Sequence, residues 1–479
     1  MRHANAANAI LSATVLVALI ASQLARADPD APTTPVVSTT AGKVQGEVVD
    51  GVYTFKGIPY AANTSGANRW TAPKDPEPWS DVRDVTTFMD ICPQPADQTM
   101  GIMDAWMGAS DLLPISYNAT EPTSENCLGL NVYTPALDEK LPVMVWIHGG
   151  GLMVGSSSQY PGKPLVSYST AMDNPVILVT INYRLGFLGY FPHPELSEAN
   201  FGLLDQIKAL EWVRENIESF GGDPSNVTIF GESAGGASVL ALMASPLSEG
   251  LFQKAIGESS AMEESHSVTV SEGSKLGVAL GYKVGVPAGP DQLEKMREVS
   301  FDKIEDAQNV MNQDGEVVIM YVAPSLPLPV FTAFEEGKTA QVPLMIGTNA
   351  NEYRVYAELG PGSGPGAENT TESYEAWVES VYGPEDAKTI LSIFPSEDMS
   401  ASQIMMNASA QVMTTAWFGA PAISPPTAAA LLGTQHSCTP SRKRQTRLRE
   451  SRLAHSTARR CPTSLRTTAT TATLGSPRQ

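Results

Sequence analysis

Predominantly apolar runs and helical periodicity alternate through the middle of the chain. Residues 141–148, 176–181 and 227–230 form apolar runs, the pattern of strands buried on both faces of a parallel sheet. Apolar side chains recur at helical spacing across residues 203–220, and small, helix-compatible residues occupy 235–240. This alternation predicts an α/β fold, with a central, mostly parallel sheet flanked by helices.

Shorter patterns extend this arrangement in both directions. Residues 36–60 predict short strands with a turn, and residues 343–347 predict one more strand. Residues 272–312 are polar and predict helical structure. The sequence Gly-Gly-Asp-Pro-Ser at 221–225 predicts a break in the chain ahead of the strand that includes Val227. No internal repeat is visible in the sequence.

Composition describes a globular protein with a large core. The 479 residues are 42% apolar and 17% charged, which fits an α/β enzyme. Charge is unevenly spread, because residues 421–479 carry ten of the 31 basic residues and one of the 51 acidic residues. The remaining body is therefore strongly acidic. It is expected to repel nucleic acid and anionic membranes, but its charge indicates nothing specific about the substrate.

The first 27 residues have the pattern of a secretory signal peptide. Arg2 and His3 precede an apolar stretch at 10–21, and Ala25-Arg26-Ala27 forms an A-x-A cleavage site. The apolar stretch is too short to span a bilayer, and no later segment is long and apolar enough to do so. We expect cleavage after Ala27 and a soluble, secreted protein, extracellular or periplasmic, without integral membrane association.

Export permits disulfide bonds. The chain has four cysteines: Cys92, Cys127, Cys438 and Cys461. The first two lie in the same region and are able to close a local loop. The other two lie in a C-terminal segment of unusual composition.

The segment Gly231-Glu232-Ser233-Ala234-Gly235 carries the strongest chemical signal. It follows an apolar run and precedes small, helix-compatible residues, the context of a G-x-S-x-G nucleophile elbow. Such a turn strains the serine backbone, so its flanks must be nearly free of side chains. The Ser233 hydroxyl is expected at the carboxyl end of the strand. The Ala234 amide, at the helix N-terminus, would face an oxyanion.

A second glycine-rich segment ends the first buried strand. In His148-Gly149-Gly150-Gly151, consecutive glycines let backbone amides approach a ligand without side chains in the way. Taken alone, this segment indicates only a glycine-rich turn. Paired with an elbow farther along the chain, it predicts the rest of an oxyanion hole, as the corresponding loop supplies in esterases and lipases.

The ordered blocks from about residue 35 to 420 resemble the type-B carboxylesterase and lipase family, which also includes cholinesterases. The matching blocks are Phe55–Ala61, Ser124–Pro135, His148–Gly155, Asn182–Gly186, Leu204–Gln206, Ala209–Val213, Asn216–Ile217, Phe220–Pro224 and Val227–Gly236. The resemblance implies an α/β-hydrolase fold that cleaves carboxylic esters through a Ser–His–Glu triad. It implies no organic cofactor and no metal.

Position by position, the resemblance assigns roles to five residues. Ser233 corresponds to the nucleophile, and the amides of Gly150, Gly151 and Ala234 correspond to the oxyanion hole. Glu352 lies in Ile346-Gly-Thr-Asn-Ala-Asn-Glu-Tyr353, just past a predicted strand, where the family has its acid. The acid would hold the tautomer of the histidine and stabilise the imidazolium. The alternative for Glu352 is an exposed loop glutamate, which the surrounding motif disfavours.

The resemblance also implies a disulfide and reveals two departures. Cys92, in Cys-Pro-Gln, and Cys127 match the first disulfide of the family. Leu152 stands where a phenylalanine usually follows the glycines, and Asn126 replaces an aspartate before Cys127. Neither departure touches the chemistry directly.

The pattern of the family breaks off near the C-terminus. Only His436 and His455 follow Glu352, and neither lies in the family's histidine block. No Phe, Tyr or Trp follows Phe418, and arginine and threonine become frequent. Residues 422–479, called the tail below, could be a basic tail that binds nucleic acid or membrane, or a solvated disordered tail. We favour a third interpretation, out-of-frame translation.

The genetic code supports this interpretation. In Leu453–Arg459, joining the third base of each codon to the first two bases of the next permits Gly-Ala-Phe-His-Gly-Ala. The family's histidine block resembles this string. The hypothesis is a frameshift between about residues 422 and 433, with residues 28–421 forming a truncated hydrolase domain whose C-terminal part is missing or disordered. The chain as written then lacks its catalytic base and an edge strand, and we expect it to be inactive and to fold poorly.

The sequence therefore predicts a secreted serine carboxylesterase or lipase of the type-B family. Its substrates would be small-molecule or lipid esters, hydrolysed through an acyl-enzyme on Ser233. The main alternative is a catalytically inactive, cholinesterase-like binding or adhesion protein. Ser233, Glu352 and the glycine loop occur together, and this argues against the alternative because a binding protein has no need of all three.

Overall fold

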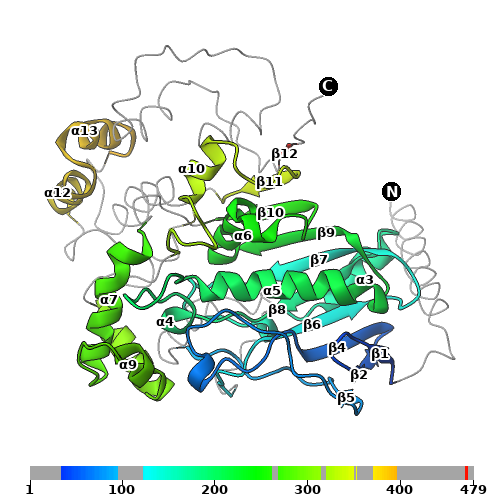
Figure 1. The fold of residues 1–479 in the computed structure, drawn as a ribbon. Coiled ribbons are helices and arrows are strands. Elements are labelled where there is room, and N and C mark those ends of the chain that lie inside the picture. Colours follow the sequence, from blue (N-terminus) through cyan, green and yellow to red (C-terminus); the bar gives the residue numbers. More distant parts are fainter. Residues whose placement is uncertain are drawn as a thin grey trace, which may run out of the picture.

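A nine-stranded sheet forms the centre of the fold in the computed structural model (Figure 1). The structure describes residues 34–94, 122–260, 268–313, 320–349, 352, 370–395 and 470–472. The sheet order is β12-β11-β10-β9-β7-β8-β6-β4-β3. In chain order the strands are β3 (Glu47–Val49), β4 (Val52–Pro59), β6 (Gly129–Thr134), β7 (Leu141–Ile147), β8 (Ile177–Ile181), β9 (Gly222–Glu232), β10 (Lys254–Glu258), β11 (Leu344–Gly347) and β12 (Thr470–Ala472).

The five middle strands, β11 to β8, run parallel to one another. Every residue of β8 is buried, as expected of a strand covered on both faces. Strands β6, β4 and β3 continue the sheet in antiparallel pairing. The predicted α/β fold with a central, mostly parallel sheet is confirmed.

Helices cover both faces of this sheet. Alternate side chains of β7 separate the two layers. Val143 and Val145 face the large core under α5 (Phe201–Asn216) and α6 (Ala234–Ala244). Trp146 packs instead with Val166 of α3 (Lys163–Ala171), on the opposite face. Strand β9 runs straight into α6, so the position of the elbow is fixed by two buried elements.

The N-terminal region adds a small sheet and a hairpin. Strands β1 (Val36–Ser38), β2 (Lys43–Gln45) and β5 (Arg83–Asp84) form a separate three-stranded sheet. A tight turn at Asp50 and Gly51, both at positive φ, joins β3 to β4. The short strands with a turn predicted for residues 36–60 are confirmed.

The remaining helices are short. They are α4 (Gly186–Gly189), α7 (Val270–Lys283), α8 (Gln292–Arg297), α9 (Phe301–Gln313), α10 (Val330–Glu335), α12 (Thr371–Tyr382) and α13 (Pro384–Ile393). Single turns of 3₁₀ helix are η1 (Gly66–Asn68), η2 (Ser157–Gln159), η3 (Ile217–Phe220) and η4 (Pro246–Ser248). Helices α12 and α13 pack on each other through a small core of their own, which includes Tyr374 and Ile390.

The helical structure predicted for residues 272–312 is confirmed as three helices, α7, α8 and α9, with a turn at Val284 and Gly285 after α7. Two expectations need correction. The break predicted at 221–225 is confined to Gly221, because the backbone of Gly222 already pairs with Leu141. The edge of β11 is not bare, because threonine-rich β12 pairs with it over three residues, and threonine suits a strand at an open edge.

Several expectations concern residues outside the described ranges. The signal peptide and its cleavage site lie there, as does the tail apart from the three residues of β12. Among the residues that the structure describes, no helix is both long and apolar enough to cross a membrane.

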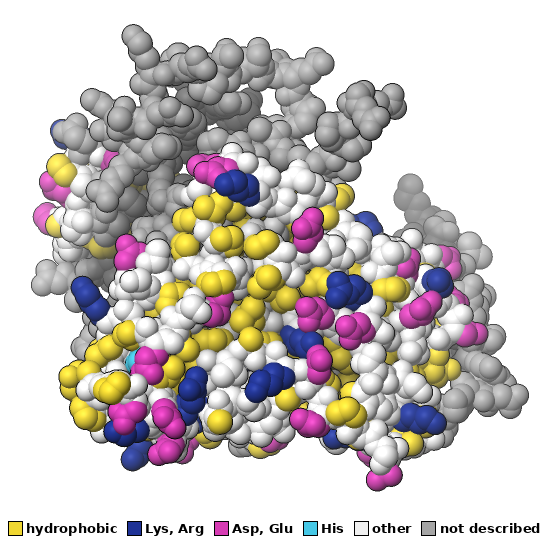
Figure 2. Space-filling view, viewed as in Figure 1, with side chains coloured by type: hydrophobic (Ala, Val, Ile, Leu, Met, Phe, Trp, Pro, Cys, Tyr) yellow, Lys and Arg dark blue, Asp and Glu magenta, His cyan; other side chains and the backbone are white. Residues whose placement is uncertain are grey.

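Hydrophobic side chains gather on the face that carries α6 and α10 (Figure 2). A pocket of about 620 Å³ lies there, lined by residues that include Met243, Phe252, Leu328 and Val342. Met243 belongs to the last turn of α6, whereas the elbow lies before its first turn. This pocket is therefore remote from Ser233 and is not part of the candidate active site.

Candidate active site

Ser233 lies in a strained turn between β9 and α6. Its backbone is at φ 57° and ψ −123°, a region that non-glycine residues rarely occupy unless the surroundings enforce it. Two hydrogen bonds hold the turn. The Ser233 N–H donates to Glu258 O at 2.9 Å, and the Ala237 N–H donates to Ser233 O at 2.9 Å.

The flanks of the serine must be glycine for steric reasons. A Cβ atom on Gly231 would lie 2.6 Å from Ile147 O, and one on Gly235 would lie 2.1 Å from the same oxygen. The end of β7 is thus pressed against the elbow, with no room for a side chain between them. This geometry is what the G-x-S-x-G pattern led us to expect at Ser233.

The glycine loop after β7 lies directly beside the serine. A Cβ atom on Gly149 would be 3.1 Å from Ser233 Cβ and 2.8 Å from Glu232 O. Gly150 and Gly151 follow at φ 106° and 65°. Gly151 has open space around it, so its backbone angle, and not crowding, favours glycine there.

Three backbone N–H groups remain available at this point. None of the hydrogen bonds among the described residues uses the N–H of Gly150, Gly151 or Ala234. Ala234 begins α6, so its N–H is one of the donors that a helix N-terminus leaves unpaired. These donors flank the Ser233 turn, as expected of an oxyanion hole.

Of the two departures from the family pattern, Leu152 lies in the glycine loop and Asn126 lies outside it. Leu152 is buried and adopts φ 62°, and its carbonyl accepts a hydrogen bond from the Gly186 N–H at 2.8 Å. Asn126 is exposed, and its N–H bonds to Ser124 Oγ at 3.1 Å.

Glu352 lies on the same side of the sheet as the elbow, beyond the carboxyl ends of the parallel strands. Glu232, Glu258 and Gly347 are register partners at the carboxyl ends of β9, β10 and β11. Glu352 follows β11, and its Oε1 atom accepts hydrogen bonds from the Asn349 N–H at 2.6 Å and from Thr348 Oγ1 at 3.0 Å.

Ser259, which no sequence pattern singled out, makes a further contact to this carboxylate. Its hydroxyl donates to Glu352 Oε1, and its own N–H donates to Gly347 O at 2.8 Å. Ser259 is buried and adopts φ 49°. It therefore links the end of β10 to Glu352, and its hydroxyl contacts the same carboxylate oxygen that Thr348 and Asn349 contact.

A model of the carboxylesterase family matches residues 33–431 of the chain. The chain belongs to the carboxylesterase family.

Individual relatives are similar over most of the described region. The para-nitrobenzyl esterase of Bacillus subtilis is 39% identical over 373 residues, covering 75% of this chain and 70% of that protein. Liver carboxylesterase 1 of Oryctolagus cuniculus is 37% identical over 365 residues, 70% of this chain but only 61% of that protein. A solved structure of a thermophilic pNB esterase superposes with a TM-score of 0.66 at 35% identity, covering 82% of this chain and 77% of that one.

Three carboxylates gather around Ser233 of this carboxylesterase. Burial, and to a smaller extent the charges of Glu352 and Glu258, together raise the pKa of Glu232 from 4.5 to about 7. Burial also raises the pKa of Glu258. The carboxylates next to Ser233 are therefore either negatively charged or close to their titration range near neutral pH. Such surroundings favour a cationic imidazolium and disfavour a further anion.

Neither histidine in the described part of the chain serves Glu352. His148 is buried and stacked on Tyr183 at 4.4 Å between ring centroids. Its Nδ1 lies 2.8 Å from Gly149 O, and burial lowers its pKa to about 4. His193 Nε2 lies 3.2 Å from Gln292 Oε1. His266, His436 and His455 lie outside the described residues.

Proposed function

We propose that this chain is a serine hydrolase of carboxylic esters. The observation that carries the proposal is the strained Ser233 turn, pressed against a glycine loop whose amides have no acceptor among the described residues. Membership of the carboxylesterase family supports it, as do relatives that are named as esterases. Small-molecule or lipid esters would be the substrates.

The reaction would proceed in two halves. Ser233 Oγ attacks the ester carbonyl carbon while its proton passes to a histidine base, and the amides of Gly150, Gly151 and Ala234 bind the oxyanion. The ester C–O bond then breaks, and the base returns the proton to the leaving alcohol. Water, deprotonated by the same base, attacks the acyl-enzyme and releases the acid and free Ser233. Glu352 would orient the base and stabilise its charged form.

The histidine base is the member of the triad that the sequence as written does not contain in its expected block. We propose that it is the histidine that a shifted frame encodes within Leu453–Arg459. The end of the family match at residue 431 supports a change of frame near that point. Resequencing the DNA for residues 422–433 tests this directly, because an intact written frame with no histidine block nearby would exclude the shift.

The activity test compares two proteins, the written chain and a version with the tail restored to the shifted frame. Each is assayed with p-nitrophenyl butyrate, with Ser233→Ala in the restored protein as the control. We expect turnover only in the restored protein, and none in its S233A variant. Equal turnover by both proteins would mean that His436 or His455 acts as the base. Turnover that survives S233A would overturn the assignment of the nucleophile.

A fluorophosphonate probe separates this function from a catalytically inactive binding protein. The probe reacts with a serine only where a working site activates it. Labelling of the restored protein at Ser233, mapped by mass spectrometry, is the expected result. A restored protein that is folded but takes up no label would favour the binding or adhesion function.

Secretion is a further part of the proposal. The pattern of residues 1–27 supports export with cleavage after Ala27. Expression with the native leader in a secreting host tests it, because the mature protein should appear outside the cytoplasm with Asp28 at its N-terminus.

A further inference from the structure

The glycine loop needs support from outside itself. Gly150, Gly151, Leu152 and Gly155 all adopt positive φ, and such backbone persists only where surrounding contacts over-determine it. Inside the loop, the N–H groups of Met153 and Val154 both donate to Gly150 O at 3.0 Å. These two bonds close a turn, but they do not attach the loop to the rest of the molecule.

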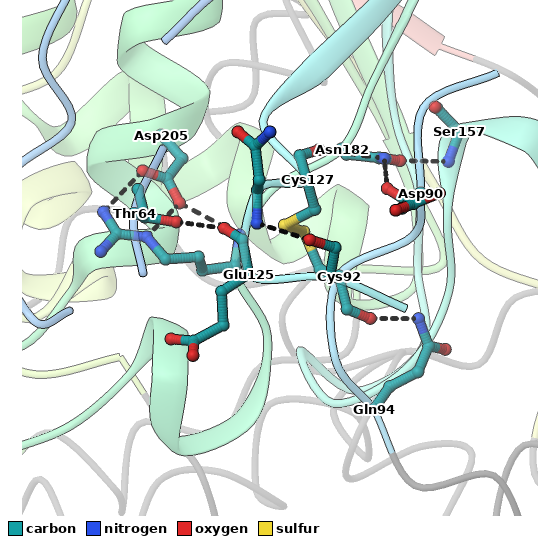
Figure 3. The surroundings of a disulfide bond; sticks show 12 residues. Thr64, Asp90, Cys92, Gln94, Glu125, Cys127, Ser157, Asn182 and Asp205 are labelled. Atoms are coloured by element: carbon teal, nitrogen blue, oxygen red, sulfur yellow. Dashed lines mark hydrogen bonds and ion pairs between the residues drawn. A yellow bond between two sulfur atoms is a disulfide. The ribbon is translucent and has the colours of Figure 1, made fainter. Parts of the chain in front are cut away.

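Gln94 attaches the far end of the loop. Its Oε1 accepts a hydrogen bond from the Gly155 N–H at 2.8 Å, and its Nε2 donates to Gly155 O at 3.0 Å. The same Nε2 donates to Cys92 O at 3.0 Å (Figure 3). Gln94 is only 7% exposed, so water cannot readily replace these bonds. Gly155 lies close to His148, because a Cβ atom there would be 2.5 Å from His148 Nδ1.

Asn182 attaches the residues just after the loop in a parallel manner. Its Oδ1 accepts from the Ser157 N–H at 2.8 Å, and its Nδ2 donates to Cys127 O at 3.2 Å and to Asp90 O at 3.4 Å (Figure 3). Asn182 is buried, and its own carbonyl accepts from Tyr60 Oη at 2.6 Å.

A disulfide joins the two attachment points. Cys92 and Cys127 are bonded, with their Cα atoms 5.0 Å apart (Figure 3). Gln94 reaches the loop from the backbone of Cys92, and Asn182 reaches it from the backbone of Cys127. Besides the Gly186 N–H that donates to Leu152 O, two buried amides thus hold the loop at Gly155 and the chain just after it at Ser157, and both are anchored on one covalent cross-link.

We propose that Gln94 is a positioning residue for the oxyanion hole, holding Gly155 so that Gly150 and Gly151 keep their place beside Ser233. It acts through the loop backbone and does not touch the substrate. The catalytic half of this inference rests on the proposed ester hydrolysis. The structural half, a loop braced by Gln94, stands on the contacts alone. The two halves are therefore tested by separate measurements.

The structural measurement is hydrogen exchange at single amides in the full chain. In Gln94→Ala we expect the Met153 and Val154 amides to exchange at least tenfold faster, although neither bonds to Gln94. The Ala237 amide, which closes the elbow on Ser233 O, should keep its rate. Gln94→Glu keeps the acceptor for the Gly155 N–H, but its ionised carboxylate cannot donate to the two carbonyls, so it should fall between wild type and Q94A. Q94E also serves where Q94A does not fold.

Gln292→Ala is the matched control. Gln292 is a buried glutamine as well, and its Nε2 donates to Val286 O at 3.0 Å, away from the glycine loop. Q292A should cost stability without selectively raising exchange at Met153 and Val154. The brace would be refuted if Q94A accelerated these two amides no more than Q292A does, or if Q94A accelerated Ala237 equally.

The catalytic measurement uses p-nitrophenyl acetate and the active form of the enzyme. Displaced oxyanion donors weaken the transition state more than the bound ester. We therefore expect Q94A to lower kcat about tenfold with little change in KM, and Q292A to leave kcat unchanged. Faster exchange at Met153 and Val154 in Q94A without a change in kcat would refute the catalytic role of Gln94 but support its structural role in holding the loop. No turnover in any form would count against the proposed hydrolysis alone.

Discussion

The raised pKa of Glu232 leads to a specific prediction about stability. Glu232 immediately precedes Ser233, and burial and the neighbouring carboxylates raise its pKa from 4.5 to about 7. In the unfolded chain the group loses its proton near its ordinary pKa. Between these two values the folded state therefore holds more protons than the unfolded state. By linkage, the free energy of unfolding must fall as the pH rises through this window.

The magnitude follows from the two pKa values. Each pH unit between 4.5 and about 7 corresponds to 1.36 kcal/mol, so the full loss is about 3 kcal/mol. The loss begins above pH 4.5 and is complete above pH 7. Below pH 4.5 the group is protonated in both states and contributes nothing.

Glu232→Gln removes the titrating group and keeps its shape. Urea unfolding of both proteins, followed by tryptophan fluorescence at several pH values from 4.5 to 8.5, measures the effect. We expect E232Q to gain about 3 kcal/mol over wild type between the two ends of this range. Glu218→Gln is the control, because Glu218 is an exposed surface carboxylate paired with Lys140, and its curve should parallel wild type.

A second variant tests the cause of the shift. The charge of Glu352 contributes to the raised pKa of Glu232, so Glu352→Gln should make the loss of stability smaller and end it at a lower pH. The reasoning would be refuted if wild type and E232Q gave parallel curves of unfolding free energy against pH.

Three further perturbations test other parts of the site and its support. In the protein with the restored tail, Ser259→Ala removes one hydrogen-bond donor from the Glu352 carboxylate and should lower kcat about tenfold with KM unchanged; an unaltered kcat would contradict the positioning role. Asp205→Asn leaves the buried Arg184 guanidinium without its ion pair, and should lower the urea-unfolding free energy by about 3 kcal/mol; a loss under 1 kcal/mol would contradict this. Gly235→Ala places a Cβ against Ile147 O and should abolish soluble folded protein. Gly151→Ala, in open space at positive φ, should lower the urea-unfolding free energy by only about 1 kcal/mol. Similar yields of folded protein from both variants would refute the steric argument.

Some strands were predictable from sequence and others were not. Strands β7 and β8 are buried on both faces, and their apolar runs show it directly. Strand β10 was not predicted because only Ala255 and Gly257 of its five residues are buried, while its two end residues, Lys254 and Glu258, are charged. Its neighbours on both sides, and not its own composition, make it a central strand.

The split of residues 272–312 into separate helices had a local signal. Pro287 and Pro290 lie between α7 and α8, and proline interrupts a helix because it lacks an N–H donor. The β9 boundary had no such signal, because Gly222 joins the strand only through its pairing with Leu141.

The sequence by itself determined the elbow at Ser233, the glycine loop before it and the α/β alternation that carries both. These features are local, since a turn without side-chain room needs glycine whatever surrounds it. The tertiary structure alone decided that Ser259 holds Glu352, that Gln94 holds Gly155, and that burial raises the pKa of Glu232. Each depends on segments that are far apart in the chain and meet near the carboxyl ends of the parallel strands. Composition and periodicity record which residues are buried, but not which buried polar groups meet.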